Sequence, residues 1–147
     1  LQLGRMDALL DMARDLHNRT MVCFPNSERM YETILYFSDA LRTQLHVAEN
    51  KKLLDSFLTP ALQKFGHQHL VTIRLRYNHA HATYMYHFFG YDGSYTNYYE
   101  AIGMLDALSN DVPLNLYAHE FHSDGRYGKL IDHVEGLLEY AQDHRLE

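Results

Sequence analysis

The strongest constraint on the fold is a turn that occurs twice at a fixed distance. Gly90-Tyr91-Asp92-Gly93 separates two stretches with helical periodicity, and Asp124-Gly125-Arg126-Tyr127 repeats this arrangement 32 residues later. When the two turns are aligned, apolar positions on either side also match, as Phe89 does with Phe121. A recurring helical hairpin predicts a stack of helix pairs, because one amphipathic pair alone cannot bury both of its apolar flanks.

Apolar residues recur at helical spacing along most of the remaining chain, so the sequence predicts an all-α fold of six to seven helices. We expect one helical-repeat domain over residues 1–147, made of a leading helix at 5–17 and helix pairs at 28–66, 69–109 and 113–144. Each pair is expected to be antiparallel and to stack on the next.

Local signals mark the ends of several predicted helices. Residues 18–27 read as a connector, in which Asn26 or Ser27 offers a side-chain oxygen to cap the following helix. Pro60 predicts a kink or a restart inside the first pair, since it removes a backbone donor. Gly66 is typical of a helix C-cap.

One segment has two interpretations. Val71, Ile73, Leu75 and Tyr77 alternate with polar residues, which is the signature of a strand and would make this a mixed α/β sensor fold. The same segment also places its apolar residues on two helical flanks and continues to Phe89. A strand of that length would be abnormal, whereas a helix of about five turns is routine, so we predict a helix.

The residues around both turns resemble the tetratricopeptide repeat, in the divergent form found in bacterial regulatory proteins. The resemblance rests on a large residue, a small residue and an aromatic, followed by a Gly-x-Tyr turn into a second helix; its positions here are Met85, Phe89, Gly93-Ser94-Tyr95 and Ile102, then Tyr117-Ala118, Phe121, Gly125-Arg126-Tyr127 and Val134. Tyr86 departs from the pattern, where the family has a small residue. The family resemblance implies an α-solenoid whose first helices line a concave groove.

The resemblance also implies a function and a site. Tetratricopeptide-like arrays bind proteins or peptides, so we expect a non-catalytic regulatory module of a signalling or transcription-regulating protein. The groove positions implied by the family are Arg76, Thr83, His87, Tyr91, Asn115, His119 and His122. Their polar side chains would grip a peptide backbone or carboxylate, with Tyr91 as an aromatic contact.

Two other functions remain open from the residues themselves. A small-molecule sensor would use a Tyr-rich pocket, lined by Tyr84, Tyr86, Tyr98 and Tyr99. A metal protein would use His119 and His122, three residues apart, together with His87. We predict no metal and no cofactor, because Glu120 points away from His119 and there is no His-Glu-x-x-His motif.

Composition narrows the class of protein and its partners. A net charge of −6 argues against nucleic-acid binding, which needs clustered Lys and Arg. No apolar run is long enough for a membrane span, and the single cysteine, Cys23, fits a reducing compartment, so we expect a cytoplasmic protein. No nucleophile is arranged with a base, which predicts that the chain is not an enzyme. The chain does not begin with Met, so we expect a fragment of a longer protein, whose apolar ends favour a homodimer.

Overall fold

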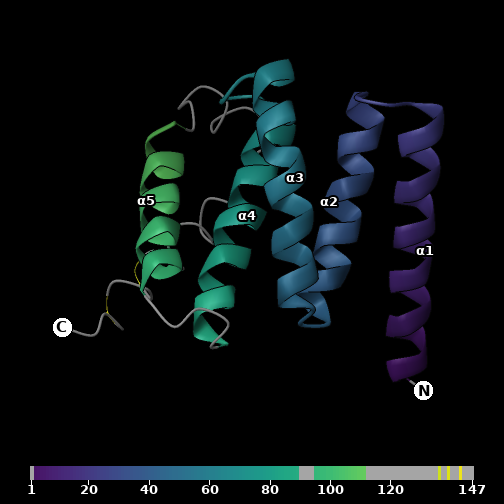
Figure 1. The fold of residues 1–147 in the computed structure, drawn as a ribbon, viewed down its shortest axis with the longest axis horizontal. Coiled ribbons are helices and arrows are strands. Elements are labelled where there is room, and N and C mark those ends of the chain that lie inside the picture. Colours follow the sequence, from purple (N-terminus) through teal and green to yellow (C-terminus); the bar gives the residue numbers. More distant parts are fainter. Residues whose placement is uncertain (1, 90–94, 112–135, 137–138, 140–142, 144–147) are drawn as a thin grey trace.

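The structure, a computed structural model, describes residues 2–89 and 95–111, together with residues 136, 139 and 143. Within these ranges it contains five helices, α1 (Gln2–Cys23), α2 (Glu28–Thr43), α3 (Val47–Phe65), α4 (Leu70–Phe88) and α5 (Thr96–Asp111). They stand in a row and each runs opposite to the one before it (Figure 1). The described part has no strand, which confirms the all-α prediction there. Most of the pair predicted over 113–144 lies outside the described residues.

Helix packing goes beyond simple neighbours. Each helix packs on the next, and α2 also packs directly on α4, although α3 separates them in the sequence. The α2–α3–α4 group is therefore a triangle of mutually contacting helices. At the two sides of the row, α1 packs on α2 and α5 packs on α4 (Figure 1).

The segment with two interpretations is a helix, as predicted, and its packing explains why it resembled a strand. Val71 and Leu75 are buried in a cluster with α2 and α3. Ile73 and Tyr77 are buried on another side of α4, against α5. Because α4 is covered on both flanks, its apolar residues occur at nearly every other position. Periodicity alone does not separate such a helix from a strand.

The first helix is longer than expected. It extends to Cys23, so the prediction of a connector over 18–27 is wrong for its first six residues. Thr20 was read as a loop residue, yet its side chain is buried between α1 and α2. Its hydroxyl group lies 2.7 Å from that of Thr33 and 3.0 Å from the backbone carbonyl of His17. These bonds satisfy a polar side chain inside a helix.

The other helix ends follow their sequence signals more closely. Ser27 caps α2, where its Oγ accepts a hydrogen bond of 3.1 Å from the backbone N–H of Met30. Gly66 ends α3 with a φ of 84°, a value that favours glycine. The predicted restart at Pro60 does not occur, since α3 is one continuous helix on both sides of this residue.

The core is divided among the helix contacts. The largest cluster fills the α2–α3–α4 triangle and contains Met30, Tyr31, Ile34, Leu35, Leu54, Ala61, Val71, Leu75 and Ala82. Smaller clusters join α1 to α2 and α4 to α5. No helix in the described ranges is both long and apolar enough to cross a membrane.

Candidate functional site

The described surface carries a groove between α2 and α4, at the one place where two helices that are not consecutive pack together. It has a volume of about 270 Å³, and its lining residues are Glu28, Glu32 and Tyr36 from α2, with His69, Leu70, Val71 and Arg74 at the start of α4. We call it the α2–α4 groove. Two carboxylates, one guanidinium and one exposed phenol ring give it a polar lining.

The α2 wall follows from helical spacing. The Ser27 cap places Glu28 in the first turn of α2, and Glu32 and Tyr36 follow at intervals of four residues. Residues at this spacing lie along one side of a helix. Tyr36 is 63% exposed, which is unusual for a large aromatic ring on a helix that is otherwise well packed. The α2 wall is therefore a row of two carboxylates followed by an exposed aromatic ring.

The opposite wall is held by His69, which has two roles. As the N-cap of α4, its Nδ1 accepts a hydrogen bond of 3.2 Å from the backbone N–H of Val71. That bond leaves the proton on Nε2, which lies 3.6 Å from a carboxylate oxygen of Glu28. The imidazole also stacks on Phe65, with ring centroids 4.6 Å apart. Three contacts thus fix the orientation of one wall of the groove.

A polar network, mostly buried, joins the three central helices and meets the groove at Arg74. Asn78 on α4 donates hydrogen bonds to Ser38 Oγ at 3.1 Å and to Asp39 Oδ1 at 3.0 Å, both on α2. Ser38 in turn donates to Asn50 on α3 at 2.7 Å. Asp39 also lies 3.9 Å from the guanidinium of Arg74, which lines the groove. Networks whose members are satisfied rigidify a core, so we expect the groove to keep its shape.

Three of the groove residues implied by the family lie in the described ranges, and all three are on a different side of α4. Arg76 pairs with Asp111 at 2.8 Å and donates to the backbone carbonyl of His67 at 3.1 Å. Thr83 is 1% exposed and donates to the backbone carbonyl of His79 at 2.7 Å. These contacts occupy both side chains within the protein itself.

The third residue, His87, belongs to an aromatic group between α4 and α5. Its ring centroid lies 4.9 Å from that of Tyr95 and 5.5 Å from that of Tyr98, and its Nδ1 is buried without a hydrogen-bond partner. The remaining implied residues, Tyr91, Asn115, His119 and His122, lie outside the described residues. A groove formed by this set stays a prediction.

The Tyr-rich pocket expected for a small-molecule sensor involves rings that are partly used in packing. Tyr84 and Tyr98 are buried, with ring centroids 6.0 Å apart, while Tyr99 is exposed. Tyr86 lies under the ammonium group of Lys51, 5.4 Å from its ring centroid. Neither the α2–α4 groove nor the open hollow at residues 65–69 is lined by these four rings. The pocket stays a prediction.

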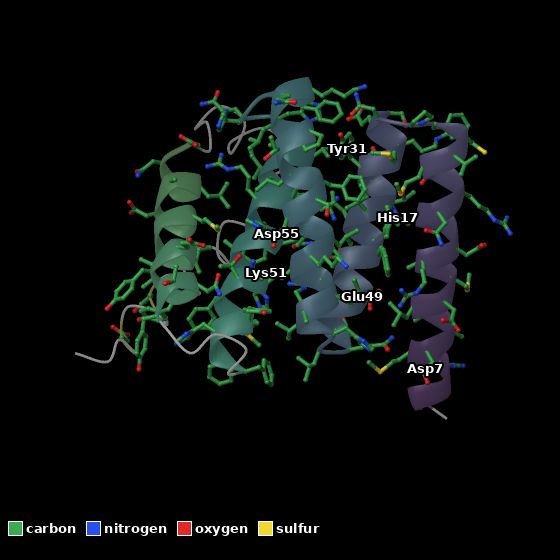
Figure 2. All side chains as sticks on the ribbon, in the orientation of Figure 1. Asp7, His17, Tyr31, Glu49, Lys51 and Asp55 are labelled. Carbon is green, nitrogen blue, oxygen red and sulfur yellow. The ribbon has the colours of Figure 1, made fainter. Side chains whose placement is uncertain are left out.

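The described ranges contain no group of three His, Cys, Asp or Glu side chains placed to hold a metal ion, and His119 and His122 lie outside them. The closest His–carboxylate pair has an evident structural role. His79 Nε2 on α4 lies 2.7 Å from Asp55 on α3, which also accepts a bond of 2.9 Å from Lys51 (Figure 2).

The electrostatics of that pair favour an ionised carboxylate. Burial of Asp55 opposes its charge, but hydrogen bonds from Lys51 and His79, with the positive charges of those groups, outweigh burial and lower the pKa of Asp55. The pair therefore ties α3 to α4 at neutral pH.

The α2–α4 groove was not predicted from the sequence, because residues on its two walls are at least 33 positions apart along the chain. One signal was available. Glu28, Glu32 and Tyr36 form an acid–acid–aromatic row beside the apolar stripe of α2, and an exposed aromatic in such a row suggests a contact surface.

Comparison with known proteins adds no family to this geometry. The chain matches no protein-family model, no curated protein and no solved structure.

Proposed function

We propose that this chain is a non-catalytic module that binds a protein or peptide partner in the α2–α4 groove. The observation that carries the proposal is the direct packing of α2 on α4 with a lined hollow between them. In stacked helix pairs, the first helices of successive pairs contact each other in this way and expose a shared face. Here α2 and α4 would be those first helices, each followed by a second helix, α3 or α5.

This assignment extends the resemblance to tetratricopeptide arrays. We infer a solenoid in which α2–α3 and α4–α5 are successive pairs, with further helices over 113–144 bringing the total to six or seven. A cytoplasmic regulatory role in signalling or transcription is the setting we propose for such a module.

The lining of the groove favours a peptide segment that carries a basic side chain. Glu32 has no ion-pair partner among the described residues, and Glu28 contacts only the imidazole of His69. A guanidinium or ammonium group between these two carboxylates would gain charge-assisted hydrogen bonds. Tyr36 offers an exposed ring for an adjacent apolar or cationic group at low entropic cost. Arg74, at the α4 wall, would donate a hydrogen bond to a backbone carbonyl of the peptide.

A random-peptide display library panned against the wild-type protein tests the proposal. We expect enriched peptides to share a basic residue and to bind at least tenfold more weakly, as an order of magnitude, to Tyr36→Ala and Glu32→Gln. Tyr99→Ala and Glu100→Gln on α5 are matched controls, because both residues are exposed there. Melting temperatures of all four variants should equal that of the wild type. Peptides that bind all four equally, or a library that yields none, would overturn the assignment of the groove.

A further inference from the structure

The first helix has two apolar seams, and only one of them is packed against another helix in the described part of the chain. The inner seam consists of Leu10, Ala13, His17 and Thr20, at spacings of three and four residues, and it packs toward α2. The outer seam is centred on Leu9, Met12 and Leu16, whose exposed fractions are 59%, 68% and 45%. Six of the twelve large apolar side chains that are exposed in the described ranges lie between Leu9 and Phe24.

The outer seam has the geometry of a helix-packing surface. With its polar and small members it comprises Arg5, Leu9, Met12, Leu16, Arg19 and Cys23, in steps of four, three, four, three and four residues. This alternation keeps a stripe facing one partner helix along its whole length, as the a and d positions of a coiled coil do. The inner seam of the same helix already shows such packing, so the outer seam fits a second helix.

We propose that the outer seam pairs two copies of this chain, with the α1 helices antiparallel about a twofold axis. Charge selects both the partner and the direction. In a parallel pair, Arg5 would face Arg5 and Arg19 would face Arg19, which is repulsive. In the antiparallel pair with Leu9 opposite Met12 of the second copy, Arg5 lies beside Asp15 of the second copy, and the symmetric pair forms as well.

The charges needed for this arrangement are available on the surface. Arg5 has no ion-pair partner in the described ranges. Asp15 pairs with Arg19 on its own helix at 3.0 Å, with both side chains mostly exposed, so it retains an open side for a second guanidinium. A twofold interface of this kind is closed and self-complementary, so association stops at the dimer. The inference is independent of the α2–α4 groove.

Sedimentation across a wide concentration range tests the pairing on the full chain. We expect a reversible dimer for the wild type and a loss of affinity of about a hundredfold for Met12→Asp, because two carboxylates would be buried at the seam. Leu45→Asp is the matched control, since Leu45 is 58% exposed and lies in the α2–α3 turn at a positive φ that Asp accepts. Circular dichroism should be unchanged in both. A wild type that stays monomeric, or a dimer that survives Met12→Asp, overturns the proposal.

A charge exchange tests the direction. Arg5→Glu and Asp15→Arg should each weaken the dimer about fivefold, and the double variant should restore it, since each exchanged charge then meets its opposite in the second copy. Failure of the double variant to recover affinity overturns the antiparallel register. Peptide binding in the groove should be the same in all of these variants. The dimer proposal and the groove proposal can therefore be disproved independently.

Discussion

The α2–α3–α4 triangle and the α1 edge are built from the same kind of helix but are held together differently. In the triangle, every helix contacts two others, and Ser38, Asn50 and Asn78 form a buried polar network across all three. At the edge, the backbone of α1 lies close to α2 alone, through a small cluster around Leu10. Only side chains of α1 reach α3, among them His17 (Figure 2), whose ring centroid lies 5.7 Å from that of Phe57. We infer that the triangle sets the stability of the described part and that the edge responds to its surroundings.

The largest expected effect on stability comes from creating a cavity in the core of the triangle. Leu75→Ala should lower the free energy of unfolding by about 2–5 kcal/mol, because Leu75 is fully buried and three helices surround the cavity. Leu10→Ala at the edge should cost about 2 kcal/mol, the lower end of that range, since a cavity under one terminal helix collapses more easily. Urea unfolding followed by circular dichroism measures both. Equal losses at the two sites would remove the distinction between triangle and edge.

An intermediate effect is expected from the polar network. Asn78→Ala removes the donor to Ser38 and Asp39 and should cost about 1–3 kcal/mol, since buried acceptors are left without their partner. The exposed Asn110 on α5 provides the control, and its change to Ala should stay within about 0.5 kcal/mol. A double-mutant cycle with Ser38→Ala should be non-additive, because the two residues share a bond. Additive losses would show that the network does not act as a unit.

The smallest expected effect on stability concerns His17 in α1. This effect depends on pH and so distinguishes the edge from the triangle. Its ring lies between Phe37 and Phe57, with centroid distances of 5.4 and 5.7 Å, and its Nδ1 is buried without a partner. Burial lowers the pKa of His17 below the usual 6.5. The charged groups nearby are Arg14, whose guanidinium lies 5.2 Å from the Phe37 ring, and its ion-pair partner Glu49 on α3.

Because the folded-state pKa of His17 is depressed, the unfolded chain takes up the proton first as the pH falls. The stability contributed by neutral His17 is therefore complete above the unfolded pKa and is lost below it. Between about pH 7.5 and about pH 5.5 we expect the wild type to lose about 1 kcal/mol that the His17→Phe variant retains. Urea midpoints at the two pH values measure this difference. An identical pH dependence in both proteins would exclude His17 as its source.

The elements that sequence reasoning recovered are those whose determinants are local. The Ser27 cap and the Gly66 terminus depend on groups within a few residues, and both were predicted. The extent of α1 was missed because Thr20 is stabilised by Thr33, a residue of the next helix. Pro60 was expected to kink or restart the helix, and the restart does not occur. Leu54 before it and Ala61 after it are both buried in the triangle, and such packing supplies most of the stability of a helix in a folded protein.

The candidate site shows the same limit. Glu28, Glu32 and Tyr36 were visible as a helical row, but their meaning depends on Arg74 and His69, which only folding brings to them. The family resemblance placed the groove on Arg76 and Thr83 instead, and in the structure these two side chains bind partners within the chain, Asp111 and the backbone carbonyl of His79. Periodicity identifies which residues share a side of a helix, and it does not identify which neighbour covers that side.

His69 would couple occupancy of the groove by the proposed ligand to the first turn of α4. The same imidazole caps that helix through Val71 and faces Glu28 across the groove. A cation bound to Glu28 would take the acceptor away from Nε2, and a rotation of the released ring would move Nδ1 away from the backbone N–H of Val71 and uncap the helix. Amide hydrogen exchange in the first turn of α4 would thus report binding of the proposed ligand, at a backbone group that the ligand itself does not touch.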